Sequence, residues 1–280
     1  MSSVLSQDTR SNIYDAYFLV THGSKSPLSW AALQTLITST NTLTEIFVGG
    51  GCLEGQPITL AQQLQQFCEN LSKQSDLEHI NVAVIPLFLL PGVHVKEDIP
   101  TEIAIAQQKM IDSIEQSIAL ELTPHLGTHP QIPTLLQSQL EAQIALIQHR
   151  NHKSNQNIGP ILLSHGSRLT EAFQTIETLA DRLGAIAAYW SVPPDLDTQI
   201  EKLIAQGKEH IIVMPYFLSS GGIMEAISQQ ISLYGDSLTD ASRRVQIDIA
   251  PVPFSPEQIA LFILDLPGLN RSLKEYWQLD

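Results

Sequence analysis

Two histidines stand where apolar stretches of the sequence end, and this placement suggests a shared chemistry. His22 follows the apolar segment 16–20, and His94 follows the apolar segment 85–90. Both segments read as buried strands of a parallel sheet, and the second leads His94 into the first turn of a helix. In an open parallel sheet the carboxyl ends of the strands line the ligand crevice, so neighbouring first and third strands would bring the two rings together. A pair of neutral imidazoles can bind a divalent metal ion or accept protons.

Glu54 is the candidate third ligand. It lies in the loop after the second predicted strand and could reach the same crevice. Two imidazoles and one carboxylate suit borderline ions such as Fe²⁺, Co²⁺ or Ni²⁺ and leave coordination positions open. The alternative to metal binding is a structural role for each histidine. For Glu54 the alternative is a solvated residue of the loop. Glu97 and Asp98 fit better as acidic residues that favour a helix start than as metal ligands.

The remaining candidate histidines have plainer interpretations. His125 and His129 flank a Leu-Gly pair, and packing of the loop is favoured over a role that faces the substrate. His165 lies at a strand end in the second half and is interpreted as a vestige without a partner. The sequence has no Gly-x-Gly-x-x-Gly after a strand and no Walker-type Gly-Lys-Ser/Thr, so dinucleotide and ATP sites are not expected. The Gly-x-Ser-x-Gly elbow of serine hydrolases is also missing.

The elements that would position these residues alternate between strands and helices, which indicates an α/β fold with a parallel sheet. Strands are predicted at 16–20, 45–50, 83–89 and 120–122, and helices over about 24–44, 57–71, 99–118 and 135–147. The segment 51–57 is predicted as a loop, with Pro57 in the first turn of the following helix. A strand order of 2-1-3-4 places the two histidine-bearing strands side by side.

The pattern then starts again, so one unit used twice accounts for the whole chain. The second set of strands is predicted at 161–167, 187–192, 211–218 and 245–250. Ile223 stands where His94 stands in the first half, so the second half lacks part of the site. We therefore expect two similar doubly wound parallel-sheet domains, at 1–147 with the site and at 160–280 with a degenerate one, joined by the polar linker 148–159.

Composition and charge narrow the class of protein. A hydrophobic content of 43% with 16% charged residues is normal for a soluble globular protein, and no apolar stretch approaches the roughly 20 residues of a membrane span. The net charge of -14 argues against nucleic-acid binding. The amino terminus resembles no secretory signal, so a cytoplasmic location is expected, where Cys52 and Cys68 would be free thiols. An anionic ligand would need local positive charge, for which Lys25 and Lys96 are the candidates.

The motifs around the two histidines resemble those of a known family, the class II tetrapyrrole chelatases of the CbiX/SirB type, which act on sirohydrochlorin. The resemblance rests on the strand into His-Gly-Ser at 22–24, the Glu54 loop, the segment 86–94 with Asp-Ile at 98–99, and Leu-Gly-Thr-His-Pro at 126–130. The second half is similar to the carboxy-terminal repeat of the long family members, and it departs from the active pattern at Ile223.

This resemblance implies a fold of two α/β domains facing across a cleft that receives the macrocycle. It implies a lyase that inserts Fe²⁺ or Co²⁺, with Ni²⁺ as a further candidate, into sirohydrochlorin without ATP, on the way to siroheme or cobalamin. His22 and His94 would bind the metal and act in catalysis, with Glu54 as the third ligand. We expect no prosthetic group and no binding to nucleic acid or a membrane. We expect the protein to be a monomer with an internal repeat.

Two other functions remain open from the sequence. A non-catalytic carrier or sensor of a metal or tetrapyrrole could use the same cleft, and it would bind one equivalent of macrocycle without accelerating metallation. A serine hydrolase using Ser24 is the third and weakest alternative. The sequence also does not select the metal or the pathway, and the partners of the substrate carboxylates could be Lys25, Lys96, Arg168 or backbone amides.

Overall fold

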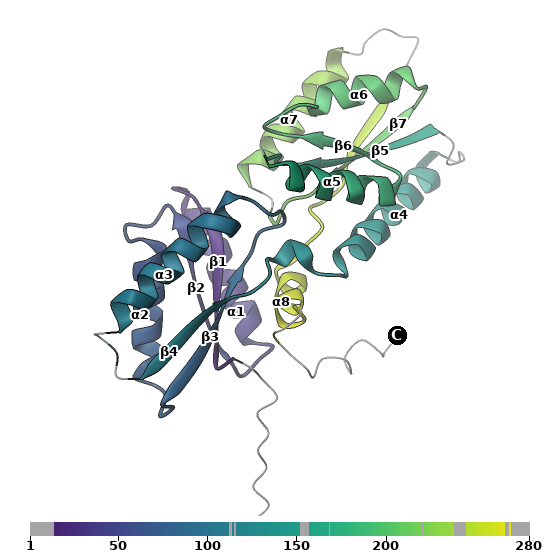
Figure 1. Cartoon of the computed structure of the whole chain (residues 1–280). Coiled ribbons are helices and arrows are strands. Elements are labelled where there is room, and N and C mark those ends of the chain that lie inside the picture. Colours follow the sequence, from purple (N-terminus) through teal and green to yellow (C-terminus); the bar gives the residue numbers. More distant parts are fainter. Residues whose placement is uncertain are drawn as a thin grey trace, which may run out of the picture. The chain divides into compact units, whose positions relative to one another are not determined.

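The computed structural model describes residues 14–111, 114, 116–151, 157–167, 169–219, 221–237, 245–266 and 269. The chain forms two compact units, each built on a four-stranded parallel sheet with helices on its faces (Figure 1). The first unit combines residues 1–88, 93–129 and 256–280, and the second combines residues 89–92 and 130–255. The predicted α/β fold with two doubly wound parallel sheets is confirmed.

The first unit has the strand order β2-β1-β3-β4. Its elements are β1 (Ala16–Gly23), α1 (Pro27–Asn41), β2 (Phe47–Glu54), α2 (Leu60–Ser72), β3 (His79–Pro86), the π-helix η1 (His94–Asp98), α3 (Ile99–Met110), β4 (Ser117–Leu122), the 3-10 helix η2 (Leu126–Thr128) and α8 (Pro256–Leu264). Strand β1 lies in the middle and pairs with β2 on one side and β3 on the other. The ends of β1 and β2 therefore lie next to each other, with Gly23 paired to Glu54.

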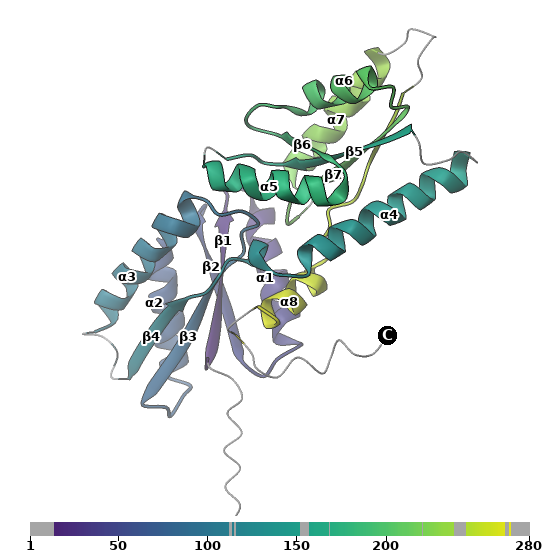
Figure 2. The ribbon, with the colours of Figure 1, turned by 45° about the vertical axis from the view of Figure 1, so that its right-hand side comes forward.

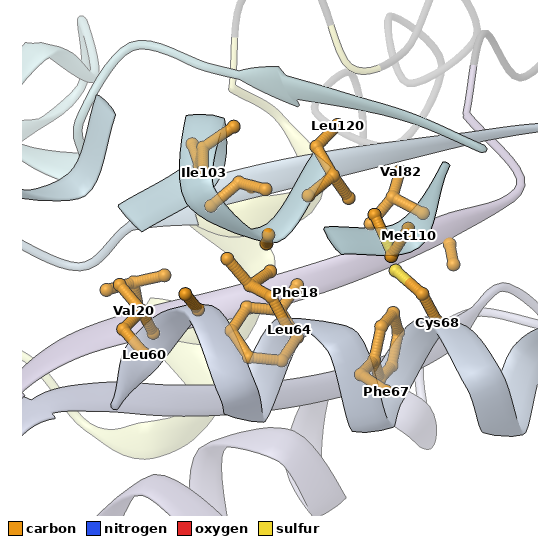
Figure 3. Packing of buried hydrophobic residues seen from close by; sticks show 14 of the residues in the cluster. Phe18, Val20, Leu60, Leu64, Phe67, Cys68, Val82, Ile103, Met110 and Leu120 are labelled. Atoms are coloured by element: carbon orange, nitrogen blue, oxygen red, sulfur yellow. The ribbon is translucent and has the colours of Figure 1, made fainter. Parts of the chain in front are cut away.

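Helices cover both faces of this sheet, so the central strands are apolar on both sides. Helices α2 and α3 pack on one face, and α1 and α8 contact each other on the opposite face (Figure 2). Figure 3 shows the core on the first of these faces, where Phe18 of β1 meets Leu64 and Phe67 of α2. The rings of Phe18 and Phe67 meet edge to face, with centroids 5.1 Å apart. This core fixes β1, and with it the residues at the carboxyl end of that strand.

Local signals in the sequence set the starts of the helices in the first unit. The Ser26 hydroxyl accepts the backbone N–H of Leu28 ahead of α1, and Pro27 occupies the first turn. Helix α2 begins with a capping box in which Thr59 and Gln62 satisfy each other's backbone N–H groups. The capping box thus fixes the segment between β2 and α2 at its carboxyl end.

The second unit has the strand order β6-β5-β7-β8 and repeats the plan of the first. Its elements are α4 (Ile132–Asn151), β5 (Ile158–Ser164), α5 (Thr170–Leu183), β6 (Ile186–Tyr189), α6 (Leu196–Ala205), β7 (His210–Pro215), α7 (Gly222–Ser237) and β8 (Gln246–Ile249). Its core lies between the sheet and α6 and α7. Ile223 packs against this core, at the position where the first half carries His94.

The units do not follow the two halves of the sequence. Helix α4 belongs to the second unit, where the side-chain amide of Gln139 donates to the carbonyl of Pro251 at 2.6 Å. Helix α8 returns to the first unit and packs on α1. The division therefore differs from the predicted domains at 1–147 and 160–280. The predicted linker overlaps the end of α4, and residues 152–156 lie outside the described residues.

Three predicted boundaries are wrong in the first unit. Strand β2 continues through its glycines to Glu54, so most of the predicted 51–57 loop is strand, and α2 begins only at Leu60. Strand β3 ends at Pro86 instead of running to residue 89. Helix α3 stops at Met110, and the residues near 118 belong to β4. Within the described residues, no helix is long and apolar enough to cross a membrane.

Candidate active site

The structure brings the rings of His22 and His94 into contact. Their centroids lie 4.7 Å apart, and the ring planes are inclined by 80°. His22 is the penultimate residue of β1. His94 is the first residue of η1, after the loop that follows β3. Because β1 and β3 are neighbours in the sheet, their carboxyl ends deliver both rings to one edge.

One ring nitrogen of each histidine is already occupied by an oxygen acceptor. Nδ1 of His22 lies 2.9 Å from the carbonyl oxygen of Gly23, and Nδ1 of His94 lies 2.6 Å from Oδ2 of Asp98. A carbonyl or carboxylate oxygen only accepts, so in each neutral ring Nδ1 carries the hydrogen. Each Nε2 then keeps a lone pair, which is the atom a neutral imidazole offers to a metal ion or a proton.

The turn that carries His94 is a π-helix, and this geometry has a local cause. The N–H of Ile99 bonds to the carbonyl of His94, five residues earlier. Pro100 in the first turn of α3 has no N–H, and its ring crowds the carbonyl four residues before it, which favours a wider turn. His94 and Asp98 lie four residues apart on one side of this turn, so the carboxylate reaches the ring.

Asp98 holds the ring of His94, a contact that the sequence analysis did not predict. The prediction gave it the role of an acid at a helix start, but its side chain caps no backbone N–H and holds His94 instead. The signal for this role was the spacing of four residues between a histidine and an acid in a helical turn. A carboxylate bonded to the second nitrogen of a ligand histidine fixes the ring and raises its basicity.

Glu54 lies at the end of β2 and lines the same pocket as His94. The pocket has a volume of about 410 Å³, and Asp98 and Glu102 also line it. The backbone here is close-packed: Gly23 has a φ of +79°, and a Cβ added to it would lie 2.1 Å from the carbonyl oxygen of Glu54. In the described part of the chain, no three His, Cys, Asp or Glu side chains are grouped closely enough to hold a metal ion. Glu54 therefore shares the pocket but does not complete a three-ligand set with the histidines.

The charged and polar surroundings of the pair are open to solvent. The side chains of His94 and Asp98 are 39% and 46% exposed, and His22 and Glu54 are exposed. Lys25 and Lys96, the residues predicted to meet an anionic ligand, are exposed as well. Arg168, the third candidate, lies outside the described residues.

His129 is buried in the first unit and packs against α8. Its side chain is buried, its ring stacks on Phe262 of α8 with centroids 4.2 Å apart, and Nε2 lies 3.6 Å from Oδ2 of Asp265. Burial lowers the pKa of His129, while the neighbouring Asp265 carboxylate opposes this shift. The packing role predicted for this histidine agrees with its position.

The second unit keeps the scaffold of the site without the pair. His165 is exposed just after β5, and its carbonyl accepts the hydroxyl and the N–H of Ser191. The residue that corresponds to His94 is Ile223, which packs against the apolar core. Cys52 and Cys68 are both buried free thiols, as expected from the sequence, and burial raises the pKa of Cys68 to about 12.

Comparison with known proteins identifies the relatives of this chain. Its structure is similar to that of SirB from Bacillus subtilis with Fe³⁺, at a TM-score of 0.66 and 17% identity, over 90% of this chain and 93% of that chain. It is also similar to CbiX, described as the terminal enzyme of siroheme biosynthesis in denitrifying bacteria, at a TM-score of 0.55 and 19% identity, over 89% and 97% of the two chains.

A third similar structure is DR2241 from Deinococcus radiodurans, a multi-domain protein with structural similarity to chelatases. The TM-score is 0.55 and the identity 15%, over 93% of this chain and 56% of that one. At these identities the likeness shows a common fold. A search of curated protein sequences gives no significant match.

The family itself is shown by a sequence profile. The profile of CbiX matches residues 16–143 and again residues 159–257, once in each half of the sequence. The first match includes both histidines of the pair, and the second includes the repeat without it. The chain belongs to the CbiX family.

Proposed function

We propose that this protein inserts a divalent metal ion, Fe²⁺ or Co²⁺, into sirohydrochlorin without ATP, as a lyase of siroheme or cobalamin synthesis. The observation that carries the proposal is the contact between His22 and His94, with Nε2 of both rings left as lone-pair donors. Family membership supplies the class of reaction, a metal insertion. Ni²⁺ accepts the same ligands and belongs among the metals to be compared.

The chemistry of metallation matches what the pair offers. The macrocycle must lose two pyrrole N–H protons as the metal forms its bonds to the four ring nitrogens, so the reaction releases two protons for each metal inserted. A neutral imidazole can first bind the incoming ion and then accept a proton once the ion has moved into the ring. Because the ligand set is incomplete, the ion is held weakly enough to be released.

Asp98 and Glu54 have separate parts in this proposal. Asp98 holds the ring of His94 so that Nε2 points away from the carboxylate, and it stabilises the imidazolium that forms when the ring accepts a proton. Glu54 is proposed as the third metal ligand, which it would become by a side-chain rotation within the pocket it shares with His94. Its exposure leaves it free to rotate.

Basic residues near the pair would meet the carboxylates of the macrocycle. The protein has a net charge of -14, so an anionic substrate needs local positive charge to bind. Lys25 follows the His-Gly-Ser turn, and Lys96 lies two residues after His94, and both are exposed. We propose these two lysines as the first contacts of the substrate carboxylates, with Arg168 as a further candidate.

The test is turnover of sirohydrochlorin under anaerobic conditions. The absorbance of the macrocycle is followed with Fe²⁺, Co²⁺ and Ni²⁺ in turn, at a protein concentration far below that of the substrate. A chelatase converts many equivalents and raises the initial rate above that of the metal alone. Binding of one equivalent of macrocycle with no increase in rate would instead identify a carrier or sensor and would overturn the proposal.

A further inference from the structure

Strand β2 is an edge strand, and two side-chain amides close two positions on its open side. The side-chain amide of Asn41 donates to the carbonyl of Val48, and its oxygen accepts the N–H of Val48, both at 3.2 Å. Gln63 does the same at Cys52, accepting the N–H at 3.1 Å and donating to the carbonyl at 2.9 Å. Each carboxamide thus binds the N–H and C=O of one residue in a closed pair of hydrogen bonds.

Gly50 lies midway between these two closed positions. Backbone groups along a strand alternate between its two sides, so the N–H and C=O of Gly50 face the same open edge as those of Val48 and Cys52. Among the described residues, no carboxamide closes Gly50 in this way, and the residue is partly exposed. The strand therefore has one unfilled position of the type that Asn41 and Gln63 fill on either side.

A pocket of about 510 Å³ opens in front of Gly50. It lies between α1 and α2, where Trp30 and Phe67 supply aromatic surface and Gln34, Gln66 and Asn70 supply carboxamides. None of the residues that line it is charged. Pockets of this size bind small molecules, and an uncharged lining favours a neutral one.

The second unit shows that this opening is not a general feature of the repeat. Gly50 pairs with Leu19 in the first sheet, and the corresponding pair in the second sheet is Ala187 with Leu162. There the side-chain amide of Gln199 donates to the carbonyl of Ala187, and Gln199 is buried. The carbonyl at the position that corresponds to Gly50 is therefore bonded by a carboxamide in the second unit.

We propose that the pocket at Gly50 binds a small, neutral, planar molecule that presents an N–H and a C=O side by side, such as a lactam ring or a primary carboxamide. Its N–H donates to the carbonyl of Gly50, and its C=O accepts the N–H of Gly50, as the amides of Asn41 and Gln63 do at the neighbouring positions. The planar body of the molecule packs against Trp30 and Phe67.

The same observations exclude an added strand as the occupant of this edge. A parallel strand on β2 would need the N–H and C=O groups of Val48 and Cys52, which Asn41 and Gln63 already hold. Only the space of one amide group is open between them. The site is also distinct from the histidine pair, although residues 56–58 line both this pocket and the one beside His94.

Nuclear magnetic resonance of the full chain labelled with [¹⁵N]glycine tests the proposal, because the amide signal of Gly50 can be followed directly. The probe is 2-pyridone, a lactam with adjacent N–H and C=O, and the matched control ligand is N-methyl-2-pyridone, which has lost the N–H. We expect 2-pyridone to shift the Gly50 amide signal in a saturable way and to bind at least about tenfold more tightly than the methylated ligand. Equal affinity of the two ligands, or no shift of Gly50 with either, would overturn the proposal.

A pair of variants on α1 separates the pocket from the rest of the surface. Trp30→Ala removes an aromatic wall and should weaken binding of 2-pyridone, whereas Leu28→Ala, at a side chain that is 79% exposed and does not line the pocket, should leave it unchanged. The glycine spectrum of each variant shows whether it is folded. Unchanged affinity in a folded Trp30→Ala protein contradicts the proposed site, and neither result depends on metal insertion.

Discussion

At the scale of single residues, the histidine pair is defined by what holds the second nitrogen of each ring. A backbone carbonyl occupies Nδ1 of His22, and a carboxylate occupies Nδ1 of His94. The two rings therefore offer the same atom, Nε2, but with different support. Only His94 has a charged partner that can stabilise a protonated ring.

Replacement of either histidine should abolish metal insertion while the protein stays folded. In His22→Ala and His94→Ala the lone-pair donor is gone, and the side chains are exposed or partly exposed, so little packing is lost. The measurement is the initial rate of the anaerobic absorbance assay with sirohydrochlorin, together with circular dichroism as the check of folding.

His165→Ala is the matched control for these variants. This histidine occupies the corresponding strand end of the second unit, where Ile223 replaces the partner. We expect the rate of His165→Ala to stay close to that of the wild type. Normal turnover by His94→Ala would refute the assignment of the pair.

Asp98 should act through His94, which a graded series of variants can reveal. Loss of a carboxylate bonded to a ligand histidine costs about 10–100-fold in metal affinity. Asp98→Ala should therefore weaken Co²⁺ binding to the free protein, measured by absorbance titration, and Asp98→Asn should restore part of it because its side-chain oxygen still accepts from Nδ1.

Glu97→Gln controls for the loss of one negative charge in the same turn, since Glu97 is exposed and does not hold the ring of His94. We expect its Co²⁺ affinity to match that of the wild type. Equal weakening in the Asp98 and Glu97 variants would assign the effect to general electrostatics and would remove the positioning role.

At the scale of elements, the site depends on the close approach of the ends of β1 and β2. Gly23 pairs with Glu54 in the sheet register, and Gly55 has a φ of +84° with no space for a Cβ beside the backbone of Ser24. Glycine is required where the chain takes a positive φ and a second backbone passes within contact distance. The glycines thus allow the turn after His22 to lie against the turn after Glu54.

Two glycine-to-alanine variants separate the effect of φ from that of space. Gly184 ends α5 with a φ of +61° and open surroundings, so Gly184→Ala should cost only about 1 kcal/mol of the free energy of unfolding. Gly23 also has a positive φ, and an added Cβ would in addition clash with the carbonyl oxygen of Glu54. Gly23→Ala should therefore lower the free energy of unfolding by more than about 2 kcal/mol and impair metal insertion. Urea unfolding measures both values, and equal costs would contradict the close approach.

How far the sequence predicts these elements depends on the kind of signal. Apolar runs identified every strand of both sheets, and the strand order 2-1-3-4 considered for the first unit matches the observed order β2-β1-β3-β4. The end of β2 was placed too early because its glycines read as a loop, whereas here they let Phe67 and the helices pack against an edge strand. The end of β3 was placed too late because the apolar run continues after Pro86 into a loop with buried residues such as Leu87.

The sequence pattern could not predict the π-helical turn or the contact of Asp98 with His94, for a different reason. A histidine and an acid four residues apart are compatible with an ion pair, a helix start or a metal site, and only the ring orientation decides among them. The contact of His22 with His94, by contrast, followed from topology alone, since neighbouring parallel strands end at the same edge. Topological placement is thus more predictable than the orientation of side chains.

At the scale of the whole molecule, the chain contributes its last described helix to the unit that contains the histidine pair. Helix α8 follows the second half of the sequence, yet it packs on α1, and its Phe262 covers the ring of His129. The first unit is therefore built from segments at both ends of the described chain. Its stability depends on residues that lie more than a hundred positions away from the rest of its core.

The burial of His129 beneath α8 should make the stability of this unit depend on pH. In the unfolded chain the imidazole has a pKa near 6.5, and burial lowers the pKa in the folded protein. As the pH falls below about 6.5, the unfolded chain takes up this proton before the folded protein does, so the free energy of unfolding decreases. Above that pH the neutral ring makes its full contribution to the free energy of unfolding. This contribution is lost only as the pH becomes acidic.

The variant His129→Phe isolates this contribution, because phenylalanine keeps a ring against Phe262 and has no proton to bind. Urea unfolding followed at several pH values between about 5 and 8 should give a steeper acid decline for the wild type than for the variant. Carboxylates and the other histidines titrate in both proteins, so the difference between the two curves belongs to residue 129 and its partner Asp265. Parallel curves would mean that His129 titrates alike in the folded and unfolded protein, against its enclosure by α8.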